Sequence, residues 1–233
     1  FLYGVCDQGN SSLQVTDIQN LPDTAFLVYE DTVNIRRAHN LFIDSAAARL
    51  YTCGVREPSG TRIPIQVWSL DNPEMPVLLR NIFEIQGVDI NYVHDMYARN
   101  DTLFMNAAWQ GLIIADMSDV DNPNLLGLMS MYPEAGYNHS GWWNERGDRY
   151  YLADETHGRD IKIVDVSNIQ APQVIQLIEA ESDPEGSIPH NLIVKDDVLY
   201  VSYYYDGLQI FDVSGDTTAC RAYNYPTSEL DPV

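Results

Sequence analysis

The segment IKIVDVSNIQAP at residues 161–172 is an apolar β-type run that ends in Asp, Ser, Asn and Pro. Runs of the same form recur at LQVTDIQNLPD (13–23), IQVWSLDNPEMP (65–76), LIIADMSDVDNP (112–123) and LQIFDVSGD (208–216). Their fifth residues are Asp17, Ser69, Asp116, Asp165 and Asp212, and they return at intervals of about fifty residues. This period indicates that the chain repeats one supersecondary unit.

Each period contains four β-type runs. The clearest unit consists of YVHDMYA (92–98), TLFMNAAW (102–109), LIIADMS (112–118) and NLLGLMSMY (124–132), separated by turn residues such as Gly, Asn, Asp and Pro. No segment carries a sustained helical apolar stripe, so we expect few helices. Four antiparallel strands in a repeat of this length are typical of a propeller blade. We therefore predict an all-β fold, a β-propeller of four-stranded antiparallel blades.

The repeat also predicts the domain organisation. We expect one propeller domain over residues 1–233, with blade units at 1–34 (partial), 35–90, 91–135, 136–186 and 187–233. The first unit offers only the later strands of a blade, and the tail from residue 215 can add an outer strand to the last one. The chain opens with FLYGV, which reads as the middle of a strand. About five blades are thus visible, and we interpret them as a segment of a larger ring that continues before residue 1.

The net charge of the chain argues against two classes of binding partner. The net charge is −21, with 34 Asp and Glu against 13 Lys and Arg, so nucleic acid and an anionic membrane surface are unsuitable partners. No apolar run approaches the roughly 18 residues of a membrane span. A protein or a glycan at a cell surface is the expected partner.

The chain has three cysteines, Cys6, Cys53 and Cys220. They form neither a disulfide framework nor a zinc signature. We expect Cys6 and Cys53 to lie near each other, with Cys220 as the alternative partner of either, and the pairing stays open.

The repeated Asp and Ser residues at the ends of the third runs are predicted to be structural. An Asp before a turn accepts a hydrogen bond from the backbone two residues on, and Ser69 can form the same local bond.

Four histidines follow the same period: His39, His94, His139 and His190. Each stands at the start of a first strand, and the first strands of a propeller line its central channel. We therefore predict a histidine ring at one mouth of the channel, with Asp95 beside it. Imidazole with carboxylate neighbours suits a transition metal. The competing interpretation is structural, because a polar residue at this position can bond to the backbone of the next blade.

The loop ADETHGRD (153–160) offers a second candidate. Its acids Asp154, Glu155 and Asp160 are possible Ca²⁺ ligands by oxygen chemistry, although the spacing is not that of an EF-hand. His157 lies in this loop and is not expected to join the histidine ring. Trp142 and Trp143, which follow His139, are expected to pack between blades, with stacking on a sugar as the alternative.

These residues resemble a known family. IKIVDVS and LQIFDVS look like the repeats named for the LVIVD consensus, and NHSGWW…DRYYLADE (138–155) is similar to a motif of the bacterial choice-of-anchor B family. Ser140 and Trp143 depart from the glutamine and leucine of that motif. The resemblance implies a secreted or surface-attached propeller, and it supplies no activity for particular residues.

Three functions are compatible with these features. The favoured one is an extracellular or cell-surface binding module of unknown ligand, since no familiar catalytic motif is present. The second is a metalloenzyme centred on the histidine ring. The third is a Ca²⁺-dependent hydrolase of anionic substrates. The cofactor is therefore undetermined between none, a transition metal and Ca²⁺.

Overall fold

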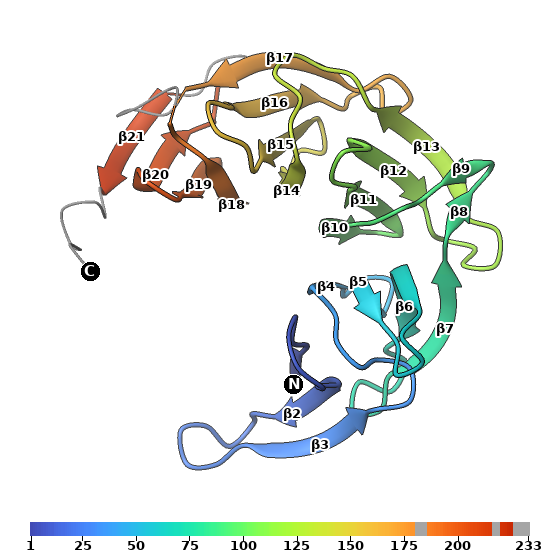
Figure 1. Cartoon of the computed structure of the whole chain (residues 1–233). Coiled ribbons are helices and arrows are strands. Elements are labelled where there is room, and N and C mark those ends of the chain that lie inside the picture. The colour runs from blue at the N-terminus through green and yellow to red at the C-terminus, as the bar shows by residue number, and fades with distance from the viewer. Residues whose placement is uncertain (180–185, 216–219, 226–233) are drawn as a thin grey trace. The chain divides into compact units, whose positions relative to one another are not determined.

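The fold was examined in a computed structural model that describes residues 1–179, 186–215 and 220–225. Every regular element in these ranges is a β-strand, and the strands form successive antiparallel sheets in chain order (Figure 1). The predicted class, an all-β propeller of four-stranded blades, is confirmed. None of the described residues forms a helix that could cross a membrane.

The sheets coincide with the predicted repeat. The first has three strands, β1 (Leu2–Gly4), β2 (Leu13–Asp17) and β3 (Phe26–Asp31), as expected for a partial blade. The second contains β4 (Asn40–Asp44), β5 (Arg49–Arg56), β6 (Arg62–Ser69) and β7 (Val77–Ile82), and the third contains β10 (Asp95–Arg99), β11 (Thr102–Asn106), β12 (Leu112–Asp116) and β13 (Asn124–Met129). The fourth contains β14 (Asn138–Trp143), β15 (Arg149–Asp154), β16 (Ile161–Asp165) and β17 (Gln173–Ile178), and the fifth contains β18 (Pro189–Lys195), β19 (Val198–Tyr203), β20 (Gly207–Asp212) and β21 (Cys220–Tyr225). The tail strand β21 pairs with β20, as predicted.

One small sheet was not predicted. The strands β8 (Glu84–Ile85) and β9 (Val88–Asp89) form a two-stranded hairpin between the second and third sheets. The turn places Gln86 and Gly87 at positive φ, and the Gly87 amide donates to the Glu84 carboxylate at 2.8 Å.

The recurrent end of the strands β2, β6, β12, β16 and β20 has a local cause. The amides of Gln19, Asp71, Ser118, Ser167 and Ser214 donate to the side-chain oxygens of Asp17, Ser69, Asp116, Asp165 and Asp212, at distances of 2.8–3.1 Å. All five repeat positions therefore end their strands with the predicted side-chain-to-backbone turn.

A β-bulge recurs just before this turn. The pairings of β2, β6, β16 and β20 with the following strand each shift register once, at Val15/Thr16, Val67/Trp68, Ile163/Val164 and Ile210/Phe211. A bulge bends a strand and increases its twist, so these four strand pairs bend at equivalent positions of the repeat.

The chain folds into two compact units. Unit 1 comprises residues 1–105 and 115–125, and unit 2 comprises residues 106–114 and 126–233. Unit 1 has an apolar core around Leu13, Ile35, Leu50 and Trp68. Unit 2 has a core in which Tyr151 and Ile163 pack with Leu199 and Phe211. Each unit thus buries its own apolar residues.

In unit 1, Cys6 and Cys53 both contact the segment 38–39 through their backbone carbonyls. The Cys6 carbonyl accepts from the Ala38 amide at 3.1 Å, and the Cys53 carbonyl accepts from the His39 amide at 2.9 Å. Both are free thiols, and burial raises the pKa of the Cys53 thiol. The side chain of Cys220 falls outside the described residues.

Unit 2 contains a buried ion pair between neighbouring strands. Lys162 Nζ of β16 lies 2.8 Å from Asp154 Oδ2 of β15, and both side chains are fully buried. Lys162 Nζ also donates to the Asp160 carbonyl at 2.9 Å, and Tyr132 Oη donates to Asp154 Oδ1 at 2.8 Å. These bonds offset part of the cost of removing two charges from water.

We expect Lys162→Met to lower the free energy of unfolding by about 3–5 kcal/mol, because Asp154 would remain buried without its counter-charge. The other lysine of the chain, Lys195, is exposed on β18 and serves as the matched control. Lys195→Met should change stability by no more than about 0.5 kcal/mol. Urea unfolding curves measure both values, and equal losses for the two variants would contradict this role of the ion pair.

Candidate functional site

The four histidines open the first strands of four sheets. His39 and His94 directly precede β4 and β10, while His139 and His190 are the second residues of β14 and β18. The register predicted from the repeat is therefore present. Two of these histidines belong to each compact unit, so each pair is described within its own unit.

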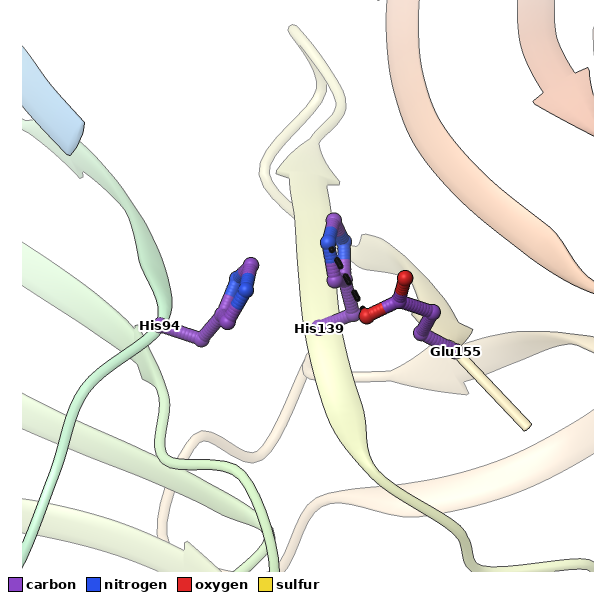
Figure 2. Close-up of side chains that lie close together, drawn as sticks. All are labelled: His94, His139 and Glu155. Atoms are coloured by element: carbon purple, nitrogen blue, oxygen red, sulfur yellow. Dashed lines mark ion pairs between the residues drawn. The ribbon is translucent and has the colours of Figure 1, made fainter. Parts of the chain in front are cut away.

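In unit 2, His139 and His190 lie side by side, and one acid faces both of them. Their ring centroids are 4.2 Å apart. Glu155 Oε2 lies 3.5 Å from His139 Nε2, and Glu155 Oε1 lies 3.8 Å from His190 Nε2. Figure 2 shows the His139 ring facing the Glu155 carboxylate, with this ion pair dashed. One carboxylate thus faces two neighbouring imidazoles.

The neighbouring strands hold Glu155 in place. It follows the last residue of β15, and its amide donates to the Tyr137 carbonyl at 2.8 Å. Its Oε1 accepts a hydrogen bond of 2.6 Å from Tyr204 Oη, which follows β19. This hydrogen bond, with smaller effects of desolvation and charge, raises the pKa of Tyr204 to about 12. Tyr204 therefore remains a phenol that donates to Glu155.

The cluster, defined as His139, Glu155, His190 and Tyr204, is partly open to solvent. The His139 side chain is 4 % exposed, whereas those of Glu155 and His190 are 25 % and 34 % exposed. A buried imidazole is thus combined with two ligand groups that solvent can reach. This arrangement allows an ion or a small polar ligand to enter from one side.

A chain of buried polar groups connects the strand ends of unit 2. Asn106 Nδ2 donates to Asn138 Oδ1 at 2.6 Å, and Asn138 Nδ2 donates to Tyr132 Oη at 3.1 Å. Tyr132 in turn donates to Asp154, and burial beside this carboxylate raises the Tyr132 pKa. Asn138 precedes His139 and Asp154 precedes Glu155, so the same network positions the two ends of the cluster.

The three acids proposed for Ca²⁺ have different surroundings. Both Asp154 oxygens are engaged, one by Tyr132 and one by Lys162, and Glu155 faces the histidines. Asp160 lies near Glu134, whose Oε2 accepts from the Asp160 amide at 3.2 Å. Burial, and then the charge of Glu134, raises the pKa of Asp160 to about 6. Ca²⁺ binding by this loop stays a prediction.

In unit 1, the other two histidines form a similar pair. The ring centroids of His39 and His94 are 4.0 Å apart, and His39 Nδ1 lies 3.3 Å from Asp7 Oδ1. Asp95 Oδ1 accepts from Asn40 Nδ2 and from the Met96 amide, both at 2.8 Å. Desolvation raises the pKa of Asp95 to about 6, although these bonds oppose the shift. Asp95 is thus fixed by its own strand and by β4.

Of the two tryptophans that follow His139, Trp142 is placed by the core of unit 2. Trp142 packs against the apolar core of unit 2, which includes residues of the fourth and fifth sheets. His157 contacts other groups: its Nδ1 lies 3.0 Å from the Gly186 carbonyl oxygen, and its ring stacks on Tyr205. Gly141 is required where it stands, because a Cβ there would lie 2.3 Å from the Tyr150 ring.

Sequence reasoning missed three partners. The sequence pattern indicates Glu155 only as a Ca²⁺ ligand, and it does not mark Asp7 or Tyr204 as partners of the histidines. Tyr204 belongs to the exposed tail of the run YYY at 203–205, where one tyrosine is buried and two are not. This aromatic run at the end of a strand is the feature of the sequence that could have indicated Tyr204.

Comparison with solved structures supports the fold. A Lactobacillus plantarum protein matches with a TM-score of 0.72 at 14% identity, over 97% of this chain and 67% of that one. A candidate 6-phosphogluconolactonase from Bacteroides uniformis gives 0.69 at 16% identity, over 97% and 67%. The periplasmic gluconolactonase PpgL of Pseudomonas aeruginosa gives 0.69 at 12% identity, over 96% and 67%. The chain spans about two thirds of the length of these structures, and the likeness shows the fold alone.

Sequence comparison gives no family. No protein-family model matches the chain, and no curated protein matches it.

The Asp160 carboxyl is expected to make the stability of the fold depend on pH. Its pKa of about 6 in the folded protein lies above the ordinary value, so between about pH 4 and pH 6 the folded state binds more protons than the unfolded state. Stability from this group is present at low pH and is lost as the pH rises through 6. The free energy of unfolding of Asp160→Asn, relative to that of the wild type, should therefore rise by about 1–2 kcal/mol as the pH increases from 4 to 7.

Unfolding free energies of both proteins at several pH values measure this difference. A difference that stays constant from pH 4 to pH 7 would show that Asp160 titrates normally in the folded protein.

Proposed function

We propose that the chain is a β-propeller binding module whose cluster in unit 2 binds a divalent transition-metal ion. One observation carries the proposal: the Glu155 carboxylate faces two imidazoles, with Oε2 at 3.5 Å from His139 Nε2 and Oε1 at 3.8 Å from His190 Nε2. These separations are longer than hydrogen bonds. Two ligands that bind one zinc ion tetrahedrally at about 2.0–2.1 Å are about 3.3–3.4 Å apart, so each of the two Glu155–imidazole separations is close to that of ligands sharing an ion.

The chemistry of the donors favours a transition metal over Ca²⁺. Imidazole nitrogen is a ligand for Zn, Cu, Fe and Ni, whereas Ca²⁺ takes oxygen ligands. Two histidines and one carboxylate also leave coordination positions for water or for a ligand atom. The Tyr204 hydroxyl, which already donates to Glu155, would orient the carboxylate from outside the ion.

The biological setting of the module is also a proposal. The likeness to LVIVD-repeat proteins of the choice-of-anchor B family, together with the acidic surface, supports a secreted or cell-surface location. The periplasmic location of PpgL, a protein of similar fold, is compatible with this view. A protein or a glycan would be the macromolecular partner, and the bound ion would contribute to its recognition.

We expect Zn²⁺ to bind the metal-free chain in isothermal titration, and Glu155→Gln and His190→Ala to weaken that affinity by about tenfold or more. His157→Ala is the matched control, because His157 lies in the same loop as Glu155 and contacts other groups. The control should bind as the wild type does, and Ca²⁺ should bind more weakly than Zn²⁺.

If Glu155→Gln and His190→Ala titrate as the wild type does, the cluster is structural and the proposal fails.

Hydrolysis of a sugar lactone is the second candidate, and the two gluconolactonase-type structures of similar fold favour it. A binding module should not accelerate the hydrolysis of glucono-δ-lactone above its spontaneous rate. A pH-stat assay with and without the protein measures this rate. Protein-dependent hydrolysis that is lost in Glu155→Gln would replace the binding-module proposal by a hydrolase that uses the same cluster.

A further inference from the structure

Unit 1 contains a basic cleft, although the chain as a whole is strongly acidic. The net charge is −21 and the chain has only 13 Lys and Arg. Three of these residues, Arg37, Arg56 and Arg62, line one cleft of about 590 Å³, together with Asp7, Gly54 and Tyr92. A cleft of this volume suits a small molecule.

The three arginines form a row across adjacent strands. Arg37 lies directly opposite Arg56, with backbone hydrogen bonds of 3.2 Å and 2.9 Å between them. Arg56 of β5 lies directly opposite Arg62 of β6. Side chains of directly opposite residues share one face of a sheet at about 5 Å, and like charges in such positions are destabilising. The row therefore works against folding stability.

The row has no acidic counterpart. Among the residues that the structure describes, ion pairs to Asp hold Arg49, Arg80, Arg146, Arg149 and Lys162, and none involves Arg37, Arg56 or Arg62. The Arg56 guanidinium instead donates to the Gly60 carbonyl at 3.1 Å. Desolvation, and then the charges of Arg62, Arg37 and Arg36, lower the pKa of Arg56. Five cations of the described residues are thus paired with Asp, whereas no ion pair holds the three arginines of the row.

The acid in the cleft has another partner. Asp7 Oδ1 faces His39 Nδ1 at 3.3 Å. Gly54, at φ 58°, brings the backbone under the cleft close to Tyr92, because a Cβ there would lie 3.0 Å from the Tyr92 hydroxyl and 2.8 Å from the His39 Cβ. An aromatic wall and a close backbone thus adjoin the arginine row.

We propose that this cleft binds a small molecule through its carboxylate or phosphate group. Guanidinium groups bind both oxyanions through paired N–H donors, and a row of three can hold one group from more than one side. The Tyr92 ring would cover an apolar face of the same molecule. The overall negative charge of the chain disfavours a polyanion such as nucleic acid, so the ligand is small. This site lies in unit 1 and is independent of the metal cluster.

The test uses inorganic phosphate, D-gluconate, 6-phosphogluconate and uncharged glucose as probes in isothermal titration of the full chain. We expect at least one of the three anions to bind, glucose not to bind, and affinity to fall as salt rises. Phosphate-bearing probes and gluconate separate the phosphate source from the carboxylate source. Arg62→Gln should weaken anion binding by about tenfold or more.

Arg80→Gln is the matched control, because it removes one charge from an exposed arginine of the same unit that is paired with Asp121. It should bind anions as the wild type does. If none of the anions binds, or if Arg62→Gln and Arg80→Gln lose affinity equally, the proposal is overturned.

A thermal measurement separates binding from folding. Without ligand, Arg62→Gln should melt at the wild-type temperature or above it, because one like-charge contact is relieved. With the anion that binds, only the wild type and Arg80→Gln should gain stability. A lower midpoint for Arg62→Gln in the absence of ligand, combined with unchanged anion binding, would show that the row is structural.

Discussion

The buried ion pair between Lys162 and Asp154 is the interaction on which the candidate metal cluster depends. It joins two neighbouring strands at the point where β15 ends, and the residue that follows Asp154 is Glu155. The Asp154 side chain also accepts a hydrogen bond from Tyr132. The backbone carbonyl of Asp154 accepts one from the Thr156 amide at 2.7 Å. Two desolvated charges are costly, so this arrangement is stable only with both partners and their hydrogen bonds in place. It fixes the end of β15, and Tyr137 and Tyr204 then hold the Glu155 amide and carboxylate.

The fold could be predicted because its signals are local and repeated. An apolar run followed by an Asp or Ser turn ends the third strand of each four-stranded sheet and the middle strand of the three-stranded sheet, and residues such as Asp165 and Ser69 bond as that pattern requires. The recurrent bulge was not predictable, because the extra residue lies on the outer strand, whose largely exposed positions show no clear apolar alternation. The hairpin at 84–89 was missed for a similar reason, because its strands have two residues each.

The candidate sites show where sequence periodicity stops being informative. The placement of His139 and His190 at strand starts follows from the repeat. Their partners Glu155 and Tyr204 come from loops, whose conformation the repeat does not set. The arginine row depends on strand register: Arg37 faces Arg56 through an isolated bridge outside the regular strands, and no period in the sequence marks it. The arginine row places like charges where they do not favour folding, which is typical of residues that serve binding.

The central claim is that Glu155 and the two histidines of unit 2 share one metal ion. Crystals grown with Zn²⁺ and measured at the zinc absorption edge test it most directly. The account predicts an anomalous peak about 2.0–2.2 Å from a Glu155 carboxylate oxygen and from the Nε2 atoms of His139 and His190. Zinc bound only at other residues, or no anomalous peak between these three side chains, would contradict it.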